Sequence, residues 1–145
     1  MPTNMTKEER EAFLADLHVC VLSINDPGKG PLTVPMWFDY ERGGDVWFMA
    51  PRNSMKGRRL EVGARMSLCV QDENPPYRYV SVEGPVTAIQ SYTIDRDMLP
   101  MAQRYLGEKG GEAYVAPQRA GHGEADSIKV VMRPERWLTV DLNKA

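Results

Sequence analysis

The chain has 145 residues, and 42% of them are hydrophobic, which is enough to bury one core in a single domain over residues 1–145. The formal net charge of -2 and the isoelectric point near 5.7 exclude a general attraction for nucleic acid or anionic lipid, so an anion site must be local. The sequence shows neither a signal peptide nor an apolar run of about 18 residues, so we expect a cytoplasmic protein with no membrane partner.

The N-terminal part of the chain predicts a helix followed by a β-hairpin. Residues 6–17 should form a short amphipathic helix, because a threonine and a glutamate have capping-box spacing and apolar residues recur at helical intervals. The β-branched run 18–24 ends at the turn-rich segment NDPGKGP, after which a second strand is expected over 32–40. Pro35 donates no ladder hydrogen bond, so that strand needs a bulge or a free edge.

The remaining strands are predicted from alternating or β-branched patterns. They are expected over residues 46–50, 65–71, 77–90, 127–132 and 136–142. Six or so strands with mostly short connections indicate a mainly β protein with flanking helices, in which an antiparallel sheet closes into a barrel.

One longer helix is predicted between the fifth and the late strands. The segment 95–106 has a helical pattern that stops at Gly107, and Pro100 must lie in its first turn or kink it. The following segment, 107–126, is rich in glycine and polar residues. It is expected to be a loop or a mobile lid, with one helical turn around Ala113.

Cysteine and histidine spacing gives no metal site. Cys20 and Cys69 each lie in an apolar run, so buried free thiols in a reducing compartment are expected. His18 begins a strand and His122 lies in the glycine-rich segment, and neither has a partner at metal-ligand spacing. We therefore expect no metal.

The stretch WFMAPRNSMKGRRL, residues 47–60, is the most informative part of the sequence. Ser54 suits the N-cap of a short helix over 55–62, and the free N–H groups at a helix start attract anions such as phosphate. Side-chain donors of matching chemistry are Arg52, Ser54, Lys56 and Arg58. Gly57 costs the helix about 1 kcal/mol, which suggests that something approaches its backbone closely. A solvated basic helix face is the alternative that spacing leaves open.

The order GPLTVPMWFDYE, VWFMAPRNSMKGRRL, RMSLCV and YVSVEGPV resembles the split-barrel flavin and deazaflavin oxidoreductases, the superfamily that includes pyridoxamine 5′-phosphate oxidase. The resemblance covers roughly residues 6–90. It implies a six-stranded antiparallel split β-barrel of the FMN-binding type. It also implies a homodimer with two equivalent cofactors in grooves between the subunits.

The resemblance assigns a site by position. Ser54 and Lys56 would hold the cofactor phosphate, with Arg52 and Arg58 as helpers and Arg59 as a further cation. Tyr79 would reach the cofactor from the partner subunit. The ring system and ribityl chain would be lined by Val34, Pro35, Met36, Trp37, Met49 and Ala50.

Two departures bear on the cofactor and substrate. Met55 stands between Ser54 and Lys56 where the phosphate oxidases carry arginine, which removes one cation. The C-terminal RWLTVDLNKA lacks the Arg-x-His element that those oxidases use on pyridoxamine phosphate, so that substrate is disfavoured. The cationic helix resembles the relatives that bind the deazaflavin coenzyme F420, whose phosphate and acidic tail suit several cations. F420 is therefore ranked slightly ahead of FMN.

The sequence thus favours a flavin-type oxidoreductase, an F420-dependent reductase of a small apolar or conjugated substrate, with no catalytic residue assigned. One alternative is an FMN-dependent oxidoreductase like pyridoxamine phosphate oxidase. Another is a non-catalytic cofactor or heme carrier. A nucleic-acid module on the basic helix is disfavoured by the net acidic charge. Trp37 and Trp47 fall in strand patterns, which favours barrel core over a lid on the cofactor.

Overall fold

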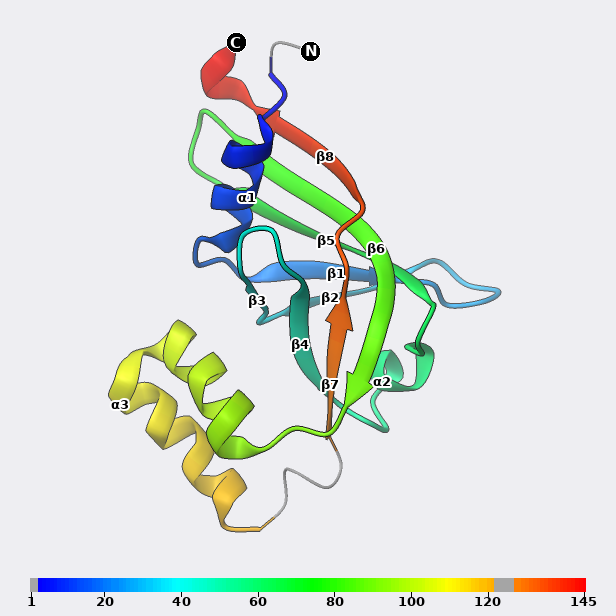
Figure 1. Ribbon diagram of the computed structural model, residues 1–145, viewed down its shortest axis with the longest axis vertical. Helices are drawn as coiled ribbons and strands as arrows, with labels where there is room; N and C mark the ends of the chain where they lie inside the picture. Colours follow the sequence, from blue (N-terminus) through cyan, green and yellow to red (C-terminus); the bar gives the residue numbers. More distant parts are fainter. Residues whose placement is uncertain (1–2, 122–126) are drawn as a thin grey trace.

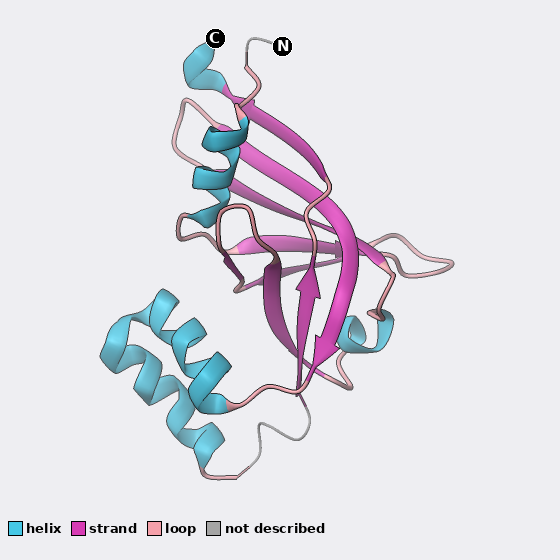
Figure 2. Ribbon diagram, in the orientation of Figure 1, coloured by secondary structure: helices cyan, strands magenta, loops and turns pink. Residues whose placement is uncertain are grey.

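The computed structural model describes residues 3–121 and 127–145, and it shows a strongly bent antiparallel sheet flanked by helices (Figures 1 and 2). The strands are β1 (Cys20–Ile24), β2 (Leu32–Met36), β3 (Asp39–Tyr40), β4 (Val46–Pro51), β5 (Arg65–Asp72), β6 (Arg78–Gln90), β7 (Ser127–Met132) and β8 (Arg136–Asp141). The helices are α1 (Lys7–Ala15), α2 (Met55–Arg59), the π-helical turn η1 (Ile94–Met98), α3 (Leu99–Arg119) and the 3-10 turn η2 (Leu142–Lys144).

The sheet order is β2-β1-β5-β6-β7-β4-β3, with β8 paired to β6, so the mainly β split-barrel fold with flanking helices is confirmed. The described residues form eight strands, so the count of six was too low. One of the additional strands arises because the predicted strand over 32–40 breaks at Trp37 and Phe38. Its two pieces pair with different strands, β2 with β1 and β3 with β4. Pro35 lies on β2, at the end of the strand order, which is the free edge that its missing N–H requires.

Strand β6 joins the two halves of the barrel. Its first part pairs with β5 and β8, and its last part pairs with β7. The strand bends where the Arg133 carbonyl crosses it, and a Cβ on Gly84 would lie 1.7 Å from that oxygen. The register shifts by a bulge between Val86 and Ala88, just past the bend. A glycine is therefore required where the barrel closes.

Two hydrophobic clusters stabilise the molecule. The larger one fills the barrel, and its largest fully buried side chains include Phe38, Phe48 and Leu14 of α1. The smaller one lies where η1 and α3 pack on the barrel, and it contains Ile94 and Val115. The helical region is thus docked on the barrel through apolar contacts of its own, and a cavity lies beside these contacts.

The structure confirms two short helices that the sequence predicts. In α1, the Thr6 hydroxyl accepts from the Glu9 N–H, while the Glu9 carboxylate accepts from the Thr6 N–H. In α2, Ser54 is the N-cap, although the helix ends at Arg59 and is shorter than expected. None of the helices in the described ranges has the length and apolar character needed to cross a bilayer.

The segment after Gly107 differs from its prediction. The chain is helical up to that residue, turns at its positive φ of 79°, and continues as a second helical arm to Arg119. The predicted loop is therefore wrong for residues 108–119, where packing between the two arms outweighs the glycine content. A Cβ on Gly111 would lie 2.4 Å from Gln103 Cγ, so the glycine allows the arms to touch. Residues 122–126 of the predicted lid lie outside the described residues.

Candidate functional site

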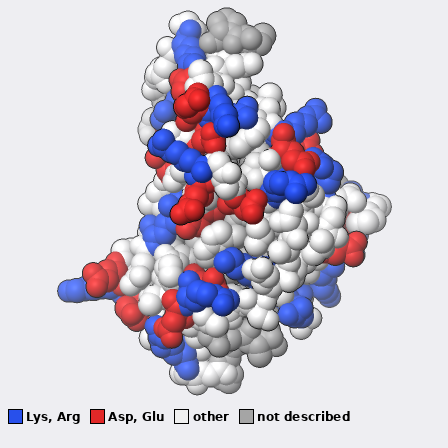
Figure 3. All heavy atoms as spheres, in the orientation of Figure 1, with Lys and Arg blue, Asp and Glu red and all other residues white. Residues whose placement is uncertain are grey.

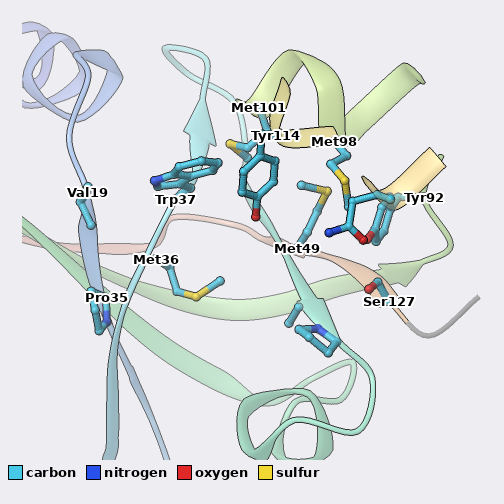
Figure 4. Close-up of a pocket in the computed structure, with 13 residues that line it drawn as sticks. Val19, Pro35, Met36, Trp37, Met49, Tyr92, Met98, Met101, Tyr114 and Ser127 are labelled. Carbon is cyan, nitrogen blue, oxygen red and sulfur yellow. The ribbon is translucent and has the colours of Figure 1, made fainter. Parts of the chain in front are cut away.

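A cavity of about 510 Å³ lies between the barrel and the helical hairpin of α3 (Figure 4). Its volume falls within the range of ordinary small-molecule sites. The lining residues are Val19, Pro35, Met36, Trp37, Met49, Ala50, Pro51, Tyr92, Met98, Met101, Tyr114, Gln118 and Ser127. Five of the six positions assigned to the ring and ribityl chain are among them, and only Val34 is not.

The barrel wall of the cavity comes from β2 and β4. Burial alternates along β4, so that Phe48 enters the core while Met49 faces the helical hairpin. Val34 lies opposite Leu22, packs against the barrel core and does not line this cavity, so its assignment to the cofactor site stays a prediction. Val34 and Met36 share the partly buried face of β2, and of these two only Met36, at the end of the strand, lines the cavity.

Trp37 belongs to the cavity wall and to the smaller cluster, which corrects its assignment to the barrel core. Its indole stacks on the Tyr105 ring with a centroid separation of 4.9 Å and an interplanar angle of 4°. The Tyr105 hydroxyl donates to the His18 carbonyl and accepts from the Phe38 N–H at 3.1 Å. Burial raises the pKa of Tyr105, so the phenol stays protonated and holds the wall in place.

Asp97 docks the helical hairpin onto the barrel. Its buried carboxylate accepts from the Arg96 Nε at 2.9 Å, the Thr93 N–H at 3.1 Å and the Lys129 Nζ at 3.2 Å. Burial opposes ionisation, but these three donors outweigh it and hold the pKa of Asp97 below its ordinary value of 3.8. Lys129 also lies 4.3 Å from the ring of Trp47, which is half-buried outside the barrel core rather than inside it.

Sequence reasoning missed the wall that the helical hairpin supplies. Met98 and Met101 precede Gly107 on a helix that was predicted but given no role, and Tyr114 lies in the segment predicted as a loop. The apolar spacing in DMLPMAQRYL was an available signal for a buried helix face. The direction of that face depends on how the arms fold back, which local spacing does not specify.

Two residues of the predicted anion site, Ser54 and Gly57, are explained by contacts within the chain itself. The Ser54 hydroxyl accepts from the Gly57 N–H at 3.1 Å and donates to the Pro51 carbonyl at 2.7 Å, so its proton already has an acceptor. A Cβ on Gly57 would lie 2.3 Å from the Pro51 carbonyl oxygen and 2.7 Å from that of Arg52. The close approach inferred at Gly57 is therefore made by the chain itself, and no ligand is needed to explain this glycine.

The cations around α2 fall into separate groups. Arg52, Lys56 and Arg58 have no carboxylate within ion-pair distance in the described part of the chain. Arg59 Nε instead lies 3.0 Å from Oδ1 of Asp26, a side chain only 6% exposed, so Arg59 is tied to the β1–β2 turn. Arg58 and Arg59 line a second hollow of about 550 Å³, and Arg52, Ser54 and Lys56 line neither cavity.

Tyr79 lies on β6, opposite Gln71 and Val140, on the outer face of the sheet. It does not line the cavity of its own chain. Its predicted role toward the cofactor of a partner subunit stays a prediction.

The distribution of charge gives no broad anion-binding surface on the face shown in Figure 3, where basic and acidic side chains are interspersed. Within the described ranges, no three His, Cys, Asp or Glu side chains gather as they would around a metal ion. His122 lies outside those ranges. The chemistry of the site therefore depends on the apolar and aromatic cavity and on the cationic side chains of the segment that follows β4 in the sequence.

The bent antiparallel sheet with its flanking helices defines a split-barrel protein, and comparison with known families agrees. The family described as pyridoxamine 5′-phosphate oxidase matches residues 6–141, and the chain belongs to that family. No curated protein matches the sequence.

Several solved structures share the fold. An F420 reductase aligns with a TM-score of 0.68 and 23% identity, covering 88% of this chain and 94% of its own. A conserved hypothetical protein from Mycobacterium tuberculosis aligns with a TM-score of 0.77 and 21% identity, covering 99% of this chain and 89% of its own. The FAD and heme binding protein from Mycobacterium smegmatis aligns with a TM-score of 0.64 and 13% identity, covering 97% of this chain and 73% of its own. At these identities the likenesses establish the fold alone.

Proposed function

We propose that the chain binds a flavin-type cofactor, F420 or FMN, in the cavity between the barrel and α3, and acts as an oxidoreductase on a small molecule. The observation that carries the proposal is continuity along one strand. Met49, Ala50 and Pro51 at the end of β4 line the cavity, and the segment with Arg52 and Lys56 follows at once. An apolar ring site with unpaired cations beside it matches a ring system that carries a phosphate.

The residues present fit such a group. The aromatic and thioether side chains of Trp37, Met36 and Met49 suit a flat ring system. Lys56 and Arg52 are the proposed phosphate anchors, with Arg58 as a helper. Ser54 would bind phosphate only by turning its proton away from the Pro51 carbonyl, so its main proposed role is to hold the anchor segment in shape.

The cofactor, when bound, supplies the transfer of a hydride or of electrons. The chain's own part is to anchor the phosphate, to hold Trp37 against the ring site and to keep water away with the α3 hairpin. F420 stays ranked ahead of FMN, because three cations around α2 lack a carboxylate partner among the described residues. Arg59 no longer supports that ranking, since its guanidinium is bound to Asp26.

We also propose that the protein is a homodimer through the outer face of the sheet. One cross-strand row on this face consists of Pro35, Val21, Cys69, Ser81 and Leu138. Val21 is 40% exposed and Leu138 is 62% exposed, so the row leaves apolar area open to water. Pro35 also lines the cavity, so a second copy on this face would reach the cavity rim and bring Tyr79 toward it.

The test is a titration of the purified protein with FMN and with F420, preceded by an absorption spectrum and mass spectrometry of any released ligand. Micromolar or tighter binding of one cofactor, followed by its turnover with an electron acceptor, supports the proposal. A heme spectrum with no flavin or deazaflavin binding would show a carrier instead. Failure to bind either cofactor overturns the assignment.

A further inference from the structure

The α3 wall of the cavity carries a hydroxyl group that has no hydrogen-bond partner among the described residues. The ring of Tyr114 lies 5.1 Å from that of Trp37, at an angle of 47°. Figure 4 shows the Tyr114 hydroxyl pointing into the space between Trp37 and Met49. No residue in 3–121 or 127–145 makes a hydrogen bond with it. A phenol directed into a cavity without a protein partner is available to a ligand.

The rest of the lining limits the ligand's charge and shape. None of the thirteen described lining residues carries a formal charge, and four of them are methionines. A ligand that entered as an ion would lose hydration without gaining a counter-charge from these residues. Aromatic and thioether side chains make their best contacts with flat, polarizable rings.

We propose that Tyr114 selects and orients the second reactant, an uncharged planar aromatic or conjugated molecule with a carbonyl group, by donating a hydrogen bond to that carbonyl. This inference rests on the proposed function, which assigns the barrel wall with Met36 and Met49 to the cofactor ring. The opposite wall, on α3, is then left to the substrate. Tyr114 is 46% exposed, so its phenol is within reach of a molecule arriving from solvent.

Three bicyclic ligands of similar size test the inference by calorimetry on the full chain. 2-Acetylnaphthalene has the neutral carbonyl, 2-ethylnaphthalene lacks it, and 2-naphthoate replaces it with a charge. We expect the ketone to bind at least about tenfold more tightly than the carboxylate. Tyr114→Phe should weaken the ketone about three- to tenfold and leave the ethyl compound unchanged. Tyr77→Phe, at an exposed tyrosine outside the cavity, is the matched control and should bind all three as the parent does.

The same variants titrated with FMN and F420 separate this inference from the proposed function. Equal binding of the ketone by the parent and by Tyr114→Phe overturns the inference, even if a cofactor binds. So does a loss of cofactor affinity in Tyr114→Phe as large as its loss of ketone affinity, because Tyr114 would then contact the cofactor. Ketone binding that depends on Tyr114 in a protein that takes neither cofactor supports the inference while the proposed function fails.

Discussion

At the scale of single residues, the anchor segment separates groups that hold the chain from groups that are free to hold a ligand. Ser54 and Gly57 shape the backbone between β4 and α2 through contacts with the Pro51 carbonyl. Arg59 neutralises Asp26. The Lys56 side chain makes neither a backbone hydrogen bond nor an ion pair with any of the described residues. Variants at these positions should therefore affect either stability or cofactor affinity, but not both equally.

Lys56→Ala and Arg59→Ala form the first pair. Removing the Lys56 ammonium deletes a charge-assisted bond of about 1.5–3 kcal/mol to the cofactor phosphate, which corresponds to roughly a ten- to hundredfold loss of affinity. Its effect on urea unfolding should be small. Arg59→Ala leaves the buried Asp26 carboxylate without its cation and should cost about 1–3 kcal/mol of stability. Unchanged cofactor affinity in Lys56→Ala would reduce the cationic segment to a solvated helix face.

Gly57→Ala should destabilise the protein although alanine is the better helix former. The new methyl group would have to displace the carbonyls of Pro51 and Arg52, a strain of about 1–3 kcal/mol. Gly30→Ala is the control, because a Cβ there meets nothing within 4 Å. Urea midpoints measure both. A Gly57→Ala variant that is more stable than the parent would show that the segment relaxes freely and is not held in one shape.

At the scale of elements, the two arms of the α3 hairpin make different contacts with the rest of the molecule. In the first arm, Arg104 donates to the carbonyls of Ala15 and Asp16 at the end of α1, at 3.2 Å, and the Tyr105 hydroxyl accepts from the Phe38 N–H of the barrel. The second arm has Val115 in the smaller cluster. Asp97, at the base of the hairpin, is therefore a main electrostatic contact between the helical region and β7.

Asp97→Asn should weaken the protein by about 1–3 kcal/mol at pH 7, because the amide has no charge to offer Arg96 and Lys129. The folded pKa of Asp97 is depressed, so its contribution is present above the ordinary value of 3.8 and is lost as the pH falls through the folded value. The difference between parent and variant should therefore shrink below about pH 4.

Urea midpoints measured between pH 2 and pH 7 test this dependence. Asp95→Asn is the control, because its carboxylate is 78% exposed and its ion pair with Arg119 should contribute about 0–1 kcal/mol. A gap between parent and Asp97→Asn that stays constant over the whole range would mean that the charge of Asp97 plays no part in docking the hairpin.

Elements whose signals are local were predictable from the sequence. The capping box of α1, the β1–β2 hairpin and the Ser54 cap each depend on residues a few positions apart. The resemblance to the split barrels assigned Met36 and Met49 to the cofactor ring, and both residues line the cavity. The second arm of α3 was missed because its glycines and Pro117 have loop character, and only contacts such as Gly111 on Gln103 explain its helical state.

At the scale of the whole molecule, the barrel buries its inner face and leaves an apolar row on its outer face. Leu138 and Val21 belong to this row, and Cys69 lies between them in the strand order. Burial raises the pKa of Cys20 to about 12 and also raises that of Cys69, which is only half-buried in the single chain. Cys69 is therefore a natural reporter of whether a second copy covers the row.

We expect light scattering to give the mass of a dimer at micromolar concentration and Cys69 to react slowly with a maleimide. Leu138→Glu would place like charges on both copies in an apolar contact, so it should yield monomers and speed the labelling of Cys69 severalfold. Leu106→Glu, at a residue 46% exposed on α3 and outside the row, should change neither mass nor labelling. Because Pro35 belongs to both the row and the cavity, the Leu138→Glu monomer should also bind the cofactor more weakly than the parent. A parent protein that is monomeric, or a Leu138→Glu monomer with full cofactor affinity, would show that one chain completes the site without its partner.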